Sequence, residues 1–243
     1  MRLSRNKSSI FFSRSINPHE KNNDTSLRGK PIAFEKVLDK DEENSINRKK
    51  FFLENKISKV VSCGLVHSSN VERVDDNSLD LISQTDSLTT NKENLFLSTT
   101  IADCLPVFIF EKEKKAVALI HAGWRGLEKE IIKKTIKKIE KEFSAKPQNL
   151  LVAIGPSICQ KHFEVKQDVF KKFKKYNSLI LTKKGKHFLD LRKVAAQQLL
   201  MSNVQKNNIE ISGECTFCSD EYFSYRRDKP KKIEAQIVVF GMI

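Results

Sequence analysis

Three residues of the types that bind zinc, His67, Cys104 and His121, each lie at the end of a stretch of sequence typical of a β-strand. A thiolate and two imidazoles suit Zn²⁺, and three protein ligands leave the fourth tetrahedral position open for water or substrate. The spacings between the three residues match no local metal motif, so spacing alone also allows three ordinary residues at strand ends. The residue types therefore indicate a catalytic zinc site, with copper as the weaker candidate, and leave the metal-free interpretation open.

A glycine-flanked turn follows directly, where His121 to Gly126 reads His-Ala-Gly-Trp-Arg-Gly. Glycine permits a positive φ and lets backbone amides approach a ligand closely. A helix starting here would present free amide hydrogens to an anion, and Arg125 would add a bidentate cation. The same pattern is equally compatible with a tight turn from strand to helix around Trp124, the only tryptophan of the chain.

Near the C-terminus, Cys215-Thr216-Phe217-Cys218 precedes the segment 223–228, Phe-Ser-Tyr-Arg-Arg-Asp. A Cys-x-x-Cys pair can bind metal or cycle between redox states. No second pair of cysteines completes a four-cysteine site, so we do not expect a structural zinc ion here. The chain has five cysteines, and this odd count argues against a disulfide framework and for metal-binding, catalytic or buried thiols. From the residues alone, segment 223–228 is better interpreted as a salt-bridged surface strand than as a phosphate clamp.

The elements that must position these residues are strands and helices in mixed order, with a hairpin more evident than repeated βαβ units. This order predicts an α+β fold in a single domain spanning residues 1–243. Residues 15–50 are polar and predict loops, with a short helix near 42–54. Apolar runs predict strands, and amphipathic patterns or a capping aspartate (Asp190) predict helices; the strands are 59–63, 106–110, 116–120, 150–154 and 233–240, and the helices are 127–143, 166–176 and 190–203.

The formal net charge is +14, which raises the question of nucleic-acid binding. The lysines are spread over the chain, and in the helix predicted at 127–143 they lie opposite an apolar face, as on a solvated surface. We therefore do not expect nucleic acid as a partner, although an anionic substrate would be attracted. No apolar run approaches the ~18 residues that cross a bilayer, and no signal peptide is evident, so we expect a cytoplasmic protein without membrane contact. The sequence does not indicate an oligomeric state.

Several motifs occur together in the order of one known family. They are Thr-Ile-Ala-Asp-Cys-Leu-Pro-Val at 100–107, the turn at 121–126, Gly155-Pro156 and the segment 223–228. Val66-His67 and Asp86-Ser87-Leu88-Thr89-Thr90 fit two further segments. The chain therefore resembles the laccase-domain family over roughly residues 57–240. Members of this family were long labelled multicopper polyphenol oxidases and are now described as purine nucleoside phosphorylases.

The resemblance implies a fold of mixed sheet layers with flanking helices, similar to cysteine deamidases. It implies His67, Cys104 and His121 as the metal ligands. It also implies phosphorolysis of adenosine, inosine and methylthioadenosine, and deamination of adenosine, with purine nucleosides and phosphate as partners. An oxidase with several copper sites would need many histidines, and this chain has five.

The chemistry of the reaction suggests roles for residues near the ligands. Asp103, beside the ligand Cys104, is predicted to move a proton or to orient a histidine. Arg125, Arg226 and Arg227 are predicted to hold phosphate electrostatically. Zinc would activate water for attack on C6 of adenosine.

Residues 1–56 depart from the family pattern, since no paired glycines follow Phe12-Ser13-Arg14, and Leu65 replaces a usual glutamine. The metal ligands are retained, so these departures concern the substrate. Two other classes stay open. One is a metal-free cysteine hydrolase or deamidase with Cys104 as nucleophile and His121 as base. The other is a non-catalytic protein that binds nucleic acid, which tight and salt-dependent binding would reveal.

Overall fold

The computed structural model describes residues 8–12, 34–35, 51–53, 55, 57–231 and 234–242. Most of the loops predicted over 15–50 lie outside these residues. Of the helix predicted near 42–54, residues 51–53 are helical and 55 is a turn, while the remainder lies outside the described residues.

In the described part of the chain, the β structure consists of two six-stranded mixed sheets and a small three-stranded sheet. The first sheet has the order β1-β15-β7-β3-β5, with β2 also paired to β15, and combines antiparallel with parallel pairs. Its strands are β1 (Ser8–Phe12), β2 (Phe34–Glu35), β3 (Lys59–Cys63), β5 (Leu81–Ile82), β7 (Leu95–Ile101) and β15 (Glu234–Met242).

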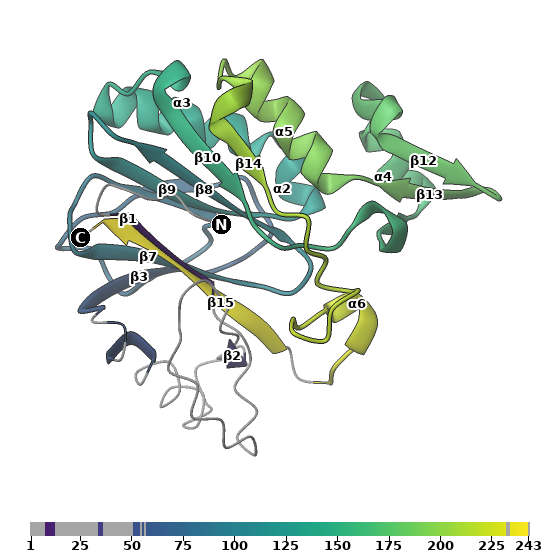
Figure 1. The fold of residues 1–243 in the computed structure, drawn as a ribbon, viewed down its shortest axis with the longest axis horizontal. Helices are drawn as coiled ribbons and strands as arrows, with labels where there is room; N and C mark the ends of the chain where they lie inside the picture. Colours follow the sequence, from purple (N-terminus) through teal and green to yellow (C-terminus); the bar gives the residue numbers. More distant parts are fainter. Residues whose placement is uncertain are drawn as a thin grey trace.

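The second sheet has the order β14-β10-β8-β9-β6-β4 and contains the predicted hairpin, in which β8 and β9 pair antiparallel. Its strands are β4 (Val71–Arg73), β6 (Ser87–Thr90), β8 (Leu105–Glu111), β9 (Ala116–Ala122), β10 (Leu150–Ile154) and β14 (Ile209–Ile211). The third sheet, β11-β13-β12, projects with helix α4 from one side of the molecule (Figure 1). It consists of β11 (Glu164–Val165), β12 (Ile180–Lys183) and β13 (Lys186–Leu189).

Helices cover one face of the second sheet, and the first sheet covers the other, so the body has three layers (Figure 1). Among residues 57–231, the α-helices are α2 (Trp124–Glu128), α3 (Ile131–Phe143), α4 (Gln167–Lys172), α5 (Leu191–Met201) and α6 (Tyr225–Asp228). The 3-10 turns of the same range are η1 (Pro147–Asn149), η2 (Gln160–His162), η3 (Lys174–Leu179) and η4 (Lys206–Asn208). The mixed sheets and flanking helices confirm the predicted α+β class.

Two predicted helices differ from those observed. The helix expected over 127–143 is divided into α2 and α3 at Glu130, which has a left-handed φ of 59°. This break lets both Leu127 and Ile131 pack, fully buried, against the core. No glycine or proline lies at the break, so the apolar pattern of the sequence predicted one continuous helix. The helix expected over 166–176 is α4 followed by η3.

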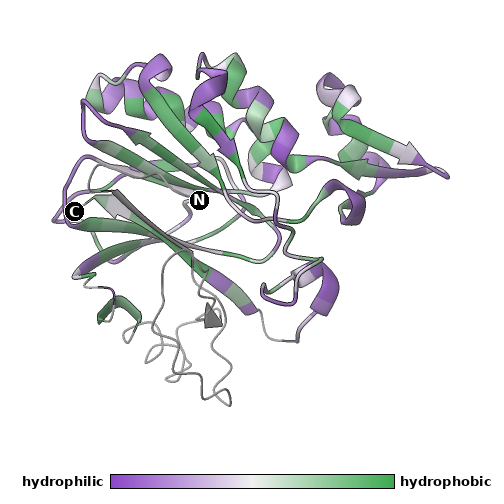
Figure 2. Ribbon diagram, viewed as in Figure 1, coloured by the Kyte–Doolittle hydropathy of each residue, from purple (hydrophilic) through white to green (hydrophobic). Residues whose placement is uncertain are grey.

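The central strands β8 and β9 of the second sheet are buried on both faces because they lie in the middle layer. Figure 2 shows the hydrophobic character of the strands in this layer. Alternate residues of β8 show this: Val107 and Ile109 pack under the helices, while Phe108 and Phe110 pack between the two sheets. Asp190 caps α5 as predicted, accepting a hydrogen bond from the Lys193 amide at 3.1 Å. This double burial fixes the strand ends that carry the candidate ligands.

Among the described residues, no helix combines the length and apolar character that a bilayer crossing requires. The cytoplasmic location stays a prediction.

Candidate metal centre

The three predicted ligands meet at one end of the second sheet. Cys104 immediately precedes β8, His121 is the penultimate residue of β9, and the pairing of Leu105 with Ala122 sets these strand ends opposite each other. His67 arrives from the loop after β3. One ligand atom from each residue lies within 4.8 Å of the other two, and the two imidazole rings stand edge-on with centroids 5.0 Å apart. A sulfur and two nitrogens at this separation fit the donor set of a zinc ion with an open fourth position.

Asp86, a residue without a predicted role, orients two of these ligands. Its fully buried carboxylate accepts a hydrogen bond from His121 Nδ1 at 2.8 Å, which leaves Nε2 as the ring nitrogen available to a metal. The same carboxylate accepts from the backbone amides of His67 at 3.0 Å and Ser68 at 2.7 Å. A carboxylate that fixes the orientation of a ligating histidine is the usual support of a metal centre. The histidine-orienting role predicted for Asp103 therefore belongs to Asp86.

Close packing and backbone strain mark the same place. A Cβ at Gly123 would lie 3.0 Å from Cys104 Sγ and 3.4 Å from His67 Cδ2, so glycine leaves room for the ligands. His67 has φ 55° and Asp103 has φ 83°, both in the left-handed region that is costly for residues other than glycine. Such strain persists where the surrounding structure enforces it, which is common at functional sites.

The electrostatics of the centre favour a thiolate. Burial opposes ionisation of Cys104, but the charge of His121 and hydrogen bonds from His121 and His67 lower the pKa of Cys104 to about 6. Burial likewise opposes a charge on His121, yet Cys104 and Asp86 raise the pKa of His121 to about 9. Against burial, His121 and Ser68 lower the pKa of Asp86 to about 2. In the metal-free protein, the imidazolium of His121 offsets part of the negative charge of these two anions, and a bound cation would replace it.

Asp103 connects the centre to the loop 212–228. Its Oδ1 accepts hydrogen bonds from the hydroxyls of Thr216 and Ser224, each at 2.7 Å, and its Oδ2 accepts from the backbone amide of Arg226 at 2.7 Å. With these three bonds, the carboxylate of Asp103 holds the loop 212–228 next to Cys104. The geometry gives Asp103 a positioning contribution, and the proton-transfer role stays a prediction.

Two of the three predicted phosphate-binding arginines have side chains with unused donors. Arg125 is exposed at the start of α2 and stacks on Trp124, with its guanidinium carbon 4.4 Å from the ring centroid. Arg226 donates from Nη1 to the Glu164 carbonyl at 3.0 Å and lies 5.2 Å from the centroid of Phe163. Helix α2, in which Arg125 is the second residue, has only five residues, so its dipole adds little to anion binding.

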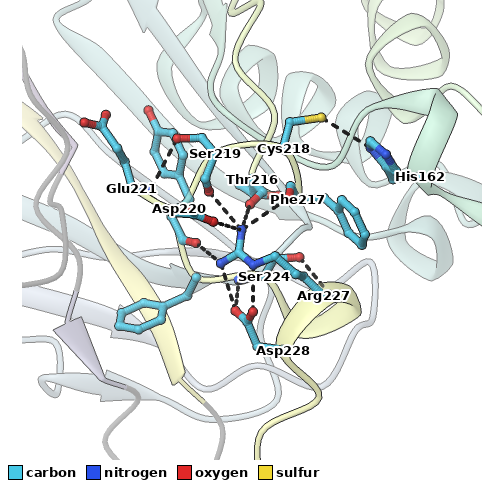
Figure 3. A network of polar contacts seen from close by, with 12 residues as sticks. His162, Thr216, Phe217, Cys218, Ser219, Asp220, Glu221, Ser224, Arg227 and Asp228 are labelled. Carbon is cyan, nitrogen blue, oxygen red and sulfur yellow. Dashed lines mark hydrogen bonds and ion pairs between the residues drawn. The ribbon is translucent and has the colours of Figure 1, made fainter.

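Arg227 differs, because its guanidinium is surrounded by acceptors of its own loop (Figure 3). Nη1 donates to the carbonyls of Thr216 and Ser219, both at 2.9 Å, and Nη2 donates to the Tyr222 carbonyl at 2.7 Å. Nε and Nη2 also form a bidentate pair with Asp228. These bonds engage every guanidinium nitrogen, so this geometry gives Arg227 a loop-holding position and not the phosphate contact we predicted.

A second cluster contradicts the premise that Cys215 and Cys218 have no partner pair. Cys159 and His162, separated by two residues, lie beside them, and the four ligand atoms are within 4.8 Å of one another. The search for a second pair considered cysteines only and so overlooked a Cys-x-x-His segment. The prediction that no structural metal ion binds at Cys215 and Cys218 therefore no longer has an argument behind it.

Comparisons with known proteins place this chain beside one family. The family described as multi-copper polyphenol oxidoreductase laccase matches residues 33–237. A relative from Bacteroides thetaiotaomicron named purine nucleoside phosphorylase is 35% identical over 155 residues, which are 61% of this chain and 57% of that protein. Another of that name from Clostridium acetobutylicum is 38% identical over 148 residues, 59% of this chain and 61% of that protein. The chain thus spans about three fifths of the length of these two relatives.

A relative from Shigella flexneri, purine nucleoside phosphorylase YfiH, is 32% identical over 189 residues, 75% of each chain. Two crystal structures have the same fold. YfiH of Bacillus licheniformis, described as a hypothetical protein, gives a TM-score of 0.79 at 28% identity and covers 84% of this chain and 82% of its own. YlmD of Geobacillus stearothermophilus gives 0.76 at 25% identity, with 83% and 81% covered.

Proposed function

The chain belongs to the multi-copper polyphenol oxidoreductase laccase family, and from that membership we propose that it is a zinc-dependent enzyme acting on purine nucleosides. The observation that carries the proposal is the convergence of His67, Cys104 and His121, with Asp86 holding His121 in place. Relatives named purine nucleoside phosphorylase support the substrate class. The proposed reactions are phosphorolysis of adenosine, inosine and methylthioadenosine, and deamination of adenosine.

The histidines of the described part of the chain support one centre of this kind and not the several copper sites of an oxidase. His67 and His121 are in the centre, whereas His162 lies in the second cluster and His187 is bonded to Thr182 and Gln167. A thiolate with two imidazoles suits zinc in a catalytic site with an open position. When bound, zinc would supply Lewis acidity at that position.

In phosphorolysis, a phosphate oxygen forms a bond to ribose C1′ while the bond from C1′ to the purine nitrogen breaks. The bonding electrons leave with the purine, which then takes up a proton. In deamination, water displaces ammonia from C6. We assign phosphate binding to Arg125 and Arg226, which have free donors, and the net charge of +14 would attract the anion. Asp103 would hold the backbone of Arg226 in place.

The first experiment combines metal analysis with turnover. The purified protein is assayed for bound metal and incubated with adenosine, with and without phosphate, while chromatography follows adenine and inosine. We expect phosphate-dependent adenine, together with phosphate-independent inosine, and a loss of about one zinc per chain and of both products in Cys104→Ala. Cys63→Ala is the matched control, because Cys63 belongs to neither cluster. An unchanged metal content in Cys104→Ala would refute the zinc assignment.

A second experiment tests the phosphate site. Arg226→Ala should raise the KM for phosphate in phosphorolysis and leave the phosphate-independent formation of inosine unchanged. Arg125→Ala is compared in the same assay. Equal KM values for phosphate in both variants and in the wild type would exclude these two residues as phosphate ligands.

One alternative has support from the geometry, namely a metal-free cysteine hydrolase. Asp86, His121 and Cys104 are linked in the order acid, base and nucleophile of a catalytic triad. The position of His67 against the same sulfur favours a metal, since a triad needs no second imidazole there. Iodoacetamide separates the two functions, because a zinc-bound thiolate should resist alkylation until a chelator removes the metal.

A further inference from the structure

A cluster of four metal-binding side chains lies beyond Asp103 from the first centre. It consists of Cys159 and His162 from the turn after β10, and Cys215 and Cys218 from the loop after β14. His162 Nδ1 is 3.3 Å from Cys159 Sγ and also 3.3 Å from Cys218 Sγ. In a tetrahedral zinc site with ordinary bond lengths, the sulfur and nitrogen ligands are about 3.5 Å apart. The observed separations are close to that value.

Both halves of the cluster are tight turns that place residues i and i+3 on the same side. His162 closes the 3-10 turn η2, and its amide donates to the Cys159 carbonyl at 3.1 Å. In the other turn, the amides of Cys218 and Ser219 donate to the Cys215 carbonyl at 3.2 and 3.1 Å. Two such turns facing each other are the arrangement of closed, four-ligand structural zinc sites, in which each pair is separated by a short interval.

The surroundings hold the ligands in orientations that suit a metal. The His162 ring stacks on Phe217, with centroids 4.1 Å apart and an interplanar angle of 15°, which fixes the direction of Nδ1. The backbone amide of Cys159 donates to Cys215 Sγ at 3.2 Å, a bond that stabilises a thiolate. An imidazole equally close to two sulfurs from different turns fits a metal ion shared by all three side chains, whereas a disulfide between Cys215 and Cys218 would not require the imidazole there.

We propose that Cys159, His162, Cys215 and Cys218 bind a structural zinc ion, separate from the centre at Cys104. With four protein ligands, this site has no open position for substrate, so the ion would act in folding and rigidity. It would join two segments far apart in the sequence. One leads through Phe163 into the projecting sheet β11-β13-β12, and the other is the loop stabilised by Arg227 (Figure 3).

The position of this ion gives it an effect on the first centre. Thr216, between the two cysteines of one turn, donates to Asp103, and the Ile158 amide, next to the other turn, donates to the Asp103 carbonyl at 3.1 Å. A metal joining the two turns would therefore brace the residue that precedes the ligand Cys104. This inference concerns a second ion and does not depend on the identity of the substrate.

The test measures zinc per chain in the full-length protein purified under reducing conditions. The wild type should bind a second equivalent of zinc that persists in Cys104→Ala and is lost in His162→Ala and in Cys218→Ser, whose side chain is exposed. His162→Cys should retain it, because four thiolates also form a closed structural site. Cys63→Ala should keep both ions.

X-ray absorption at the zinc edge identifies the ligands in the Cys104→Ala background. Three sulfurs at about 2.3 Å and one nitrogen at about 2.0 Å are expected there. Equal zinc contents in the wild type, His162→Ala and Cys218→Ser would overturn the proposal. It would also be overturned by a Cys215–Cys218 disulfide in the native protein, seen as a loss of two hydrogens by mass spectrometry, with no second zinc taken up after reduction. Neither result would refute the proposed reactions on nucleosides, which Cys104→Ala tests independently.

Discussion

Replacing Asp86 with asparagine should weaken metal binding at the first centre without removing a ligand. The carboxylate accepts from His121 Nδ1 at 2.8 Å and from the amides of His67 and Ser68. Asparagine has almost the same shape, but it carries no charge and presents an NH2 group where the carboxylate has an oxygen. One of the amides of the loop 66–68 would then face a donor instead of an acceptor.

The expected magnitude follows from these contacts. Loss of a carboxylate that supports a ligating histidine typically costs 10–100-fold in metal affinity, which is about 1.4–2.7 kcal/mol. The full burial of Asp86 and its pKa of about 2 place the effect toward the upper end of that range, since no water can replace the lost charge. We therefore expect a zinc affinity lower by roughly 30–100-fold, accompanied by a decrease in kcat/KM at limiting zinc.

Competition with a chromophoric chelator measures the affinity of the wild type and of Asp86→Asn. Asp76→Asn is the matched control, because Asp76 is an exposed aspartate paired at the surface with Lys92 at 3.6 Å. Circular dichroism confirms that each variant is folded. If Asp86→Asn bound zinc as tightly as Asp76→Asn, the bond from His121 to Asp86 would not support a metal ligand, and the proposed organisation of the centre would be wrong.

Three further predictions concern the same region. In metal-free protein, the alkylation rate of Cys104 by iodoacetamide should rise through a midpoint near pH 6, because the thiolate forms above its lowered pKa of about 6. Peptide mass spectrometry measures this rate, and a midpoint above pH 8 would contradict the described electrostatics. Gly123→Ala should lower zinc affinity roughly tenfold by chelator competition, since the new Cβ would press on Cys104, whereas unchanged affinity would show that the centre accommodates it. Arg227→Ala should reduce the free energy of unfolding in urea by about 2–3 kcal/mol and leave the KM for phosphate unchanged, and a raised KM with unchanged stability would restore the phosphate-binding role.

The proximity of two ligands could be predicted from the sequence because it depends on one hairpin. Charged residues 111–114 between two apolar runs indicate a turn, and antiparallel pairing about that turn brings the start of one strand, just after Cys104, beside the end of the other, where His121 pairs with Pro106. Only the residue types and the family resemblance indicated His67. Its approach depends on the parallel pairing of β3 with β7 and on the bonds of its loop to Asp86, contacts that no local pattern encodes.

The roles of the polar residues were harder to predict because they depend on the direction in which each side chain points. Asp103 and Asp86 both belong to recognised motifs, yet only the structure shows that Asp86 faces the histidine and Asp103 faces the loop. Arg226 and Arg227 are neighbours with opposite environments, one stacked on Phe163 and the other enclosed by carbonyls. The two arginine side chains point in different directions because they lie in the four-residue helix α6. The sequence of this segment had indicated a strand. The division of the predicted helix at Glu130 was similarly hidden, since no sequence breaker accompanies it.

The rigidity of the first centre depends on both of its neighbouring loops through two buried carboxylates. Asp86 fixes His121 and the loop of His67, while Asp103 ties the backbone beside Cys104 to the loop 212–228. Arg227 and the second cluster hold that loop from the other side. Because a metal centre is sensitive to displacements of its ligands well below 1 Å, a disturbance in the loop would reach Cys104 through Asp103. The left-handed backbone at Asp103 and His67 is consistent with this view, since each of these strained residues is held by the hydrogen bonds of one of the two carboxylates.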